Sequence, residues 1–266
     1  MGFGSAPGPL AKEPTEPELD GLSPRRSSAA LAQAGSGATR GKGGPAPWVP
    51  TRRMMTATKV RLRFAKRGDL RLVSHHDLLR CLERTLRRAP IPMAVSQGFN
   101  PRPKIVFALA LALGIEGRRE VVELELAEPM EPAEVLQRLV AASPPGLDWL
   151  DVEAVAPGRS APQAEAVQYR LEVPRDRQDA TRSRLDVLLA STQWPYTRHR
   201  PDRDVAIDVR PFVLGAELDP PGVLRFRMKM TPNGSARPEE VIDVLGLGDL
   251  LGQGKVLVRS EVELAP

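Results

Sequence analysis

The sequence contains one cysteine and no long apolar run, and each shortage excludes a class of protein. A lone Cys81 forms no intrachain disulfide and no cysteine-based zinc or iron–sulfur site. No stretch of about eighteen or more apolar residues occurs, which predicts no membrane-spanning helix and no membrane partner. P-loop, dinucleotide-binding, nucleophile-elbow and zinc-protease motifs are also absent. We therefore expect no metal, no cofactor and a cytoplasmic location.

The first 53 residues are rich in proline and glycine, with eight and nine of them, and have almost no large aliphatic side chains. Such a segment cannot bury enough apolar surface to offset the entropy lost on ordering the backbone. We predict a disordered tail over residues 1–55. Either this tail is a genuine flexible extension, or translation starts at Met54 or Met55. Because no basic region is followed by an apolar run, we do not expect a secretory signal.

Charge is distributed unevenly, although the formal net charge of +5 is modest. Residues 59–104 hold twelve Lys and Arg against three Asp and Glu, whereas residues 105–266 hold nineteen against twenty-six. A basic block in an otherwise acidic region indicates either a polyanionic partner or a solvated face neutralised by acidic strands nearby. The first interpretation requires the positive charges to gather on one exposed surface.

The apolar pattern of the first half predicts strands and helices in alternation. Apolar and basic side chains alternate over residues 60–64, as in a half-buried strand, and residues 70–73 are expected to be the extended second arm of a hairpin. Ser74 and Asp77 form a capping box for a helix that ends at Pro90 and buries a leucine stripe. Further strands are expected over residues 104–109, 121–126 and 147–155, with a helix over residues 131–142.

The same order returns after a linker at residues 156–162 that is rich in proline and glycine. Strands are expected over residues 169–173, 205–209, 213–214, 223–230 and 256–264, and helices over residues 176–190 and 238–245. The order β-α-β-β-α-β is the split-βαβ, or ferredoxin-like, pattern. We predict an α+β fold of tandem ferredoxin-like (βαββαβ) halves with mainly antiparallel sheets, over residues 59–156 and 167–266. A single mixed α+β domain is the alternative.

The helix predicted over residues 74–89 has a basic face opposite its leucines. The basic side chains at helical spacing are His76, Arg80, Arg84, Arg87 and Arg88. Arginine binds phosphate in a bidentate way, and each phosphate contact adds salt-dependent affinity. Together with Arg71, this face is a candidate site for RNA or phosphate. The alternative is an ordinary charged helix surface.

The helix start, Ser74 to Asp77, is the most polar cluster of the chain. Free backbone amides at such a position suit an anion. His75 titrates near neutral pH and is the candidate acid or base, with Asp77 beside it. Alternatively, Ser74 and Asp77 only cap the helix while His75 packs locally. Zinc is not expected, because adjacent side chains on a helix point in different directions and no further ligand pair is evident.

The loop that follows this helix combines rigidity with groups suited to binding. Gly98 permits an unusual backbone angle, and Phe99 can anchor the loop or stack on a base. The predicted contact residues of the loop are Gln97, Gly98, Phe99, Asn100, Arg102 and Lys104. Pro101 and Pro103 also restrict the backbone, so a purely structural role is the alternative.

Four segments together resemble the bacterial radical-SAM-linked proteins, a domain family of unknown function. They are FAKRGDLRLVSHHD (64–77), SQGFNPRPK (96–104), IDVRP (207–211) and SARPEE (235–240). The family has leucine at the position of His76 and histidine at that of Arg102. The resemblance implies a partner enzyme that uses S-adenosylmethionine, in a setting of RNA metabolism. This chain lacks the three-cysteine motif of such enzymes, so it would recognise or present a substrate for the partner.

Three functions follow from these observations. The first, which we favour, is an accessory protein, not itself an enzyme, that binds transfer or ribosomal RNA or presents a substrate to a radical SAM enzyme. The second is an RNA-processing or RNA-modifying enzyme with His75 as acid or base. Its support is that tandem ferredoxin-like halves resemble CRISPR RNA-processing endonucleases, at the level of fold alone. The third is a protein–protein adaptor that binds no nucleic acid.

Overall fold

Residues 57–266 are described by a computed structural model and belong to one compact unit. The prediction of a disordered tail, and the two methionines offered as start sites, lie outside these described residues. Within the described part of the chain, no helix is long and apolar enough to cross a membrane.

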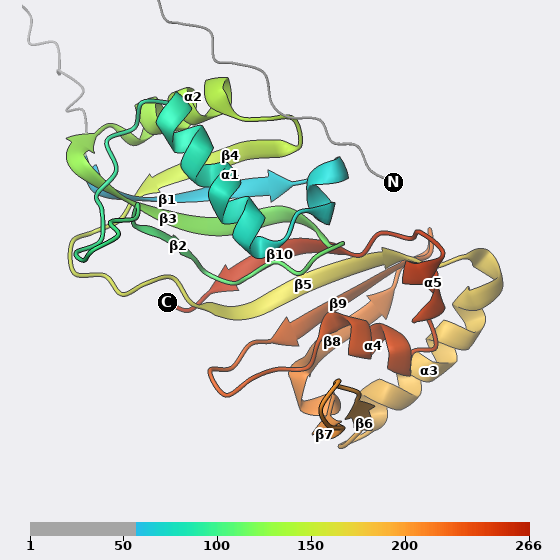
Figure 1. Ribbon diagram of the computed structural model, residues 1–266. Helices are drawn as coiled ribbons and strands as arrows, with labels where there is room; N and C mark the ends of the chain where they lie inside the picture. Colours follow the sequence, from blue (N-terminus) through green and yellow to red (C-terminus); the bar gives the residue numbers. More distant parts are fainter. Residues whose placement is uncertain (1–56) are drawn as a thin grey trace, which may run out of the picture. The chain divides into compact units, whose positions relative to one another are not determined.

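The first half alternates strands and helices (Figure 1). Its elements are β1 (Ala57–Lys66), the 3₁₀ helix η1 (Gly68–Leu72), α1 (His75–Arg88), β2 (Ile105–Phe107), β3 (Glu116–Met130), α2 (Pro132–Ala142) and β4 (Leu147–Ala154). Both helices pack on the same face of the sheet. There Leu78 and Leu139 join Val60, Leu62 and Val122 in one apolar core.

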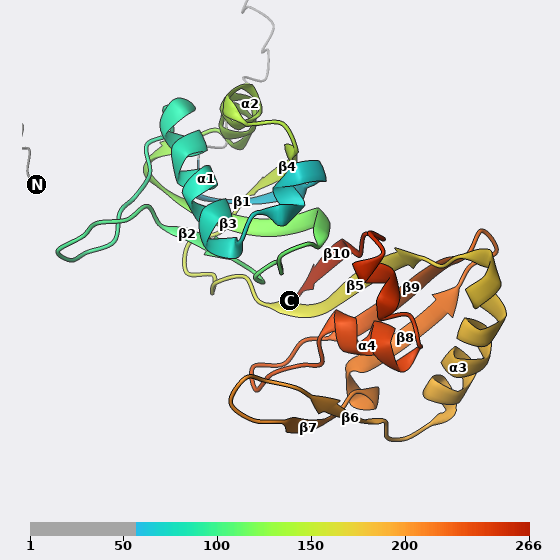
Figure 2. The same cartoon turned by 45° about the vertical axis from the view of Figure 1, so that its right-hand side comes forward.

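The second half has a similar sequence of elements with one inserted ribbon. They are β5 (Ala164–Glu172), η2 (Arg175–Arg177), α3 (Gln178–Ala190), β6 (Pro195–Arg198), β7 (Val205–Asp208), η3 (Arg210–Phe212), β8 (Val213–Leu218), β9 (Val223–Lys229), α4 (Pro238–Val244), α5 (Asp249–Gly252) and β10 (Val258–Leu264). The helices α3, α4 and α5 cover one face of these strands (Figure 2). Leu185, Val241 and Leu250 pack there against Leu171 and Phe226.

One large sheet runs through both halves in the order β4-β1-β3-β10-β5-β9-β8, and β2 pairs with β3. All of these neighbours are antiparallel except β3 and β10, which are parallel where Glu116 stands opposite Val258. The strands β6 and β7 form a separate ribbon. The protein is therefore a mixed α/β fold with a mostly antiparallel sheet.

Register divides β1 and β3 into an apolar face and a charged face. Leu62 stands opposite Val122, and both belong to the core beneath α1 and α2. Arg61 stands opposite Glu123, so these two side chains point to the reverse face. The alternation of apolar and basic residues in β1 thus reflects a strand with helices on one side and acidic neighbours on the other.

The predicted helix after Ser74 is confirmed. The Ser74 hydroxyl accepts the backbone N–H of Asp77 at 3.2 Å, which satisfies one of the free amides of the first turn. Leu78, Leu82 and Leu86 are buried, as their spacing indicates. Most of the other expected strands and helices are present, with their ends moved by a few residues.

The prediction of an extended segment over residues 70–73 is wrong, because the chain forms η1 there. Gly68 has a φ of +58°, which turns the backbone away from the direction of β1. The carbonyl of Val73 accepts a hydrogen bond from the Nζ of Lys66 at 2.7 Å and not from a strand. Leu72 is 60% exposed, so the alternating leucines do not mark a buried face. The short elements β6 and α5, of four residues each, were also not predicted.

Candidate nucleic-acid interface

The outer side of α1 carries exposed arginines. Arg84 and Arg87 are exposed, and neither side chain forms a hydrogen bond or an ion pair within residues 57–266. Arg80 is 3.1 Å from Asp77 in an exposed pair. Arg88 donates from Nε and Nη2 to the carbonyl of Ala142, at 3.1 and 3.0 Å, and so closes the C-terminal end of α2. Of the predicted arginines on this helix, Arg84 and Arg87 are thus the most available to a ligand.

The loop between α1 and β2 forms a hairpin that extends away from the first half (Figure 2). We call it the 94–104 hairpin. The N–H of Ser96 donates to the carbonyl of Arg102 at 2.8 Å, and the N–H of Lys104 donates to the carbonyl of Ala94 at 2.9 Å. The Ser96 hydroxyl also accepts the N–H of Arg102 at 3.1 Å. These hydrogen bonds brace the base of the hairpin.

The tip of the 94–104 hairpin exposes most of the predicted contact residues. Exposed there are Gln97, Gly98, Phe99, Asn100 and Arg102. The ring of Phe99 is 101% exposed, so it gains nothing from packing within the protein. Gly98 adopts a φ of +139°, a backbone angle that residues other than glycine rarely adopt. An exposed ring on a braced loop suits stacking on an unpaired base.

Two other predicted contact residues have partners within the protein. Lys104 forms an ion pair with Glu125 at 2.7 Å, with both side chains about half-exposed. Arg71 donates to the carbonyl of Gly68 at 3.1 Å. The structure therefore leaves only part of the predicted set exposed and without a partner among the described residues.

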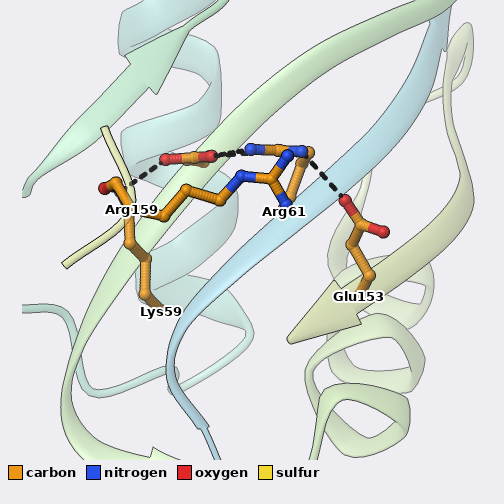
Figure 3. Close-up of polar contacts among 5 residues, drawn as sticks. Lys59, Arg61, Glu153 and Arg159 are labelled. Atoms are coloured by element: carbon orange, nitrogen blue, oxygen red, sulfur yellow. Dashed lines mark hydrogen bonds and ion pairs between the residues drawn. The ribbon is translucent and has the colours of Figure 1, made fainter. Parts of the chain in front are cut away.

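The basic residues of β1 are neutralised on the reverse face of the sheet. Arg61 is 8% exposed and lies 2.7 Å from one oxygen of Glu123 and 3.1 Å from Glu153 (Figure 3). The ammonium of Lys59 is 2.7 Å from the other oxygen of Glu123. The expectation that the positive charges of residues 59–104 gather on one exposed surface is therefore wrong for this strand. Acidic strands nearby neutralise it, which was the alternative interpretation of the charge pattern.

A buried polar cluster lies where β1, β3 and β10 meet. Arg259 donates to both oxygens of Glu120, from Nε at 2.9 Å, and from Nη1 to the carbonyl of Ala110 at 3.0 Å. Glu120 and Arg259 are each 2% exposed. Lys66 is fully buried nearby, and burial lowers the pKa of its ammonium group while Glu120 opposes that shift.

Lys66 was not predicted as a buried polar residue, although the alternation of β1 indicates its position. Val60, Leu62 and Phe64 point into the core at every second position of β1. The same alternation places Lys66 on the inward face, where a charged residue needs a polar partner. No comparable signal exists for Glu120 and Arg259, because their pairing depends on two strands far apart in the chain.

His75 is the first residue of α1 and lies beside the polar cluster. Its ring packs edge-on against Phe107, with the ring centroids 4.8 Å apart. Its Nδ1 is buried and has no hydrogen-bond partner within residues 57–266. Burial lowers the pKa of His75, and the nearby charges of His76, Lys66 and Arg259 lower it further. The imidazole is therefore neutral at pH 7, and its surroundings disfavour the protonated form.

Asp77 does not complete a catalytic pair with His75. Its carboxylate accepts from the Ser74 hydroxyl at 2.7 Å and from Arg80 at 3.1 Å, and these contacts lower the pKa of the carboxyl group. This is a capping arrangement. Among the described residues, no group of three or more His, Cys, Asp and Glu side chains is placed to hold a metal ion. A catalytic role for His75 stays a prediction.

The fold and the site together define a mixed α/β protein with an arginine-bearing helix and an aromatic-tipped hairpin. Residues 59–238 match a family described as an uncharacterized protein conserved in bacteria (DUF2344), and the chain belongs to this family. The match spans α1, the 94–104 hairpin and most of the large sheet. No curated protein matches the sequence.

Proposed function

We propose that this protein is an accessory protein that binds RNA, such as transfer or ribosomal RNA, and presents it to a radical enzyme that uses S-adenosylmethionine. The observation that carries the proposal is the combination of Arg84 and Arg87, exposed and unpartnered within the described residues, with the exposed ring of Phe99 on the hairpin that follows. The enzyme partner rests on the sequence resemblance described above.

The two arginines are spaced to contact one stretch of RNA backbone. Residues three apart on a helix have Cβ atoms about 5–6 Å apart, so the side chains of Arg84 and Arg87 are neighbours. Arg80 lies one turn earlier, and an exposed ion pair such as its pair with Asp77 is weak enough to be exchanged for a phosphate. Each phosphate contact releases counterions and so adds salt-dependent affinity.

The 94–104 hairpin would supply the contact to a base. Single-stranded RNA is recognised chiefly by stacking of unpaired bases on aromatic or guanidinium planes. Phe99 offers such a ring, and Asn100 and Arg102 are exposed polar groups beside it. Because hydrogen bonds already brace the base of the hairpin, binding would cost little additional ordering.

The strand order supports the description of the two halves as tandem ferredoxin-like units, which we include in the proposal. β1 and β2 lie on either side of β3, as a split βαβ unit requires, and β5 and β8 lie on either side of β9 in the same way. Four-stranded sheets of this kind form the RNA-binding RRM module.

We also propose a cytoplasmic location, where RNA and a radical enzyme would meet.

Replacing Arg84 and Arg87 together with glutamine should weaken binding to single-stranded RNA and make it less dependent on salt. Two lost phosphate contacts reduce the slope of log K against log salt by about 1.4.

Replacing Phe99 with alanine should weaken binding by about 1–3 kcal/mol while the slope stays the same, because stacking is not ionic. Fluorescence anisotropy with a labelled RNA over a range of salt concentrations measures both effects.

The matched control removes two exposed arginines elsewhere, Arg175→Gln with Arg182→Gln, which are also unpartnered within the described residues. This control changes the net charge equally and should bind RNA nearly as the wild type does. Equal losses in the two double variants would mean that net charge alone is responsible, and unchanged binding by the α1 variant would refute the proposal.

A further inference from the structure

A second cationic site lies on the face of the C-terminal strands that α3, α4 and α5 leave uncovered. Tyr169 and Leu171 point into the core beneath those helices, so Arg170 points to the opposite face. A cavity of about 500 Å³ opens there, with valines of β9 and β10 among its lining. Its charged lining residues are Glu116, Arg118, Arg170, Glu172, Arg225 and Lys255.

The register of the sheet sets two arginines against each other in this cavity. Arg170 of β5 stands directly opposite Arg225 of β9, and on its other side it faces Val258 of β10. Like charges directly opposite on one face of a sheet repel. Arg225 is partly neutralised by Asp219 at 3.1 Å, whereas Arg170 has no acidic partner and no side-chain hydrogen bond within residues 57–266.

The other cations of the cavity leave one more donor unused. Arg118 pairs with Glu116 at 2.9 Å, yet its Nε is buried and has no hydrogen-bond partner among the described residues. Lys255 lies 3.5 Å from Glu172. Each of these two cations is matched by a carboxylate, as Arg225 is, and the uncompensated positive charge resides at Arg170.

We propose that this cavity binds a phosphate group between Arg170 and Arg225. Guanidinium groups bind phosphate through two parallel hydrogen bonds, and phosphate has enough oxygens for both arginines. An anion at this position would remove the repulsion between the two guanidinium groups. The volume of the cavity falls in the range of small-ligand sites. The site is separate from α1 and does not depend on the proposed RNA contacts there.

The probe for this site is inorganic phosphate, added to the full chain in phosphate-free buffer at constant ionic strength. Saturable binding should raise the midpoint of thermal unfolding of the wild type. Arg170→Gln should weaken the apparent affinity at least about tenfold, because a charge-assisted bidentate contact is lost. Without phosphate this variant should be at least as stable as the wild type, since the repulsion with Arg225 is gone. Arg182→Gln is the matched control and should respond as the wild type does.

A wild type without a saturable response, or an Arg170→Gln variant with the wild-type response, would overturn the site.

A competition measurement then identifies the source of the phosphate group. Displacement of phosphate by a short RNA with a 5′ phosphate, but not by the same RNA without it, would assign the site to an RNA end. Failure of both RNAs to displace bound phosphate would assign it to a phosphorylated small molecule. Equal displacement by both RNAs would contradict recognition of a terminal phosphate.

Discussion

The imidazole of His75 occupies surroundings that disfavour its protonated form. Burial of the ring, which packs on Phe107, lowers its pKa from the usual 6.5, and the positive charges of His76, Lys66 and Arg259 lower it further. The folded protein therefore binds this proton less tightly than the unfolded chain does. The contribution to stability is complete above pH 6.5 and is lost as the pH falls toward the pKa of the folded state.

Replacing His75 with glutamine should flatten the pH dependence of stability between about pH 7 and pH 5, because the group that takes up a proton on unfolding is removed. Urea denaturation at a series of pH values measures the free energy of unfolding across this range. The same slope for His75→Gln as for the wild type would rule out the lowered pKa.

Single residues also show why a charge count does not locate a binding surface. Lys59 and Arg84 belong to the same basic block, yet Lys59 is bound to Glu123 and Arg84 is exposed. The alternation of β1 does indicate that its basic residues share one face. It cannot indicate which acids lie opposite, because that depends on the register with β3 and β4. The helix face could be predicted since its neighbours lie within the helix itself.

Among the elements, α1 was the most predictable because its determinants are local. The cap at Ser74 and the leucine spacing lie within one stretch of sequence. In contrast, the alternating leucines of η1 suggest a strand. A strand is excluded only by the backbone angle of Gly68 and by the contact of Lys66 with the Val73 carbonyl. The 94–104 hairpin was predicted as a rigid loop, but its hydrogen-bonded base was not.

Replacing Ser74 with alanine should lower the free energy of unfolding by about 1 kcal/mol, because a backbone amide in the first turn of α1 loses its acceptor. Ser183→Ala is the matched control on the exposed side of α3, where the hydroxyl only donates to the Asp179 carbonyl one turn earlier. That change should stay within about 0.5 kcal/mol. Urea denaturation compares the two, and a cost as small for Ser74→Ala as for the control would show that the cap does not stabilise the protein.

At the scale of the whole molecule, the parallel pairing of β3 with β10 joins the two halves into one sheet. The ion pair of Glu120 and Arg259 spans this junction, between residues 139 positions apart in the chain. Local sequence patterns carry no information about such a contact. They predicted similar halves, but not that one sheet would run through both.

Glu120→Gln should lower the free energy of unfolding by about 3–5 kcal/mol, because it leaves the buried guanidinium of Arg259 without its counter-ion. The double variant Glu120→Gln with Arg259→Met should recover part of this loss, since no unpaired charge remains buried. Denaturation in guanidinium chloride of Glu120→Gln, Arg259→Met and the double variant gives the coupling energy between the two residues. A double variant less stable than Glu120→Gln alone would show that the unpaired guanidinium of Arg259 is not the cause of the loss.

The central position of β10 also bears on biosynthesis. This strand inserts between β3 and β5, which both precede it in the chain and are therefore synthesised earlier. Until it arrives, both neighbours present unpaired edges of the kind that promote self-association. Nascent chains halted before residue 258 lack the strand that closes these edges and should therefore be clients of ribosome-associated chaperones.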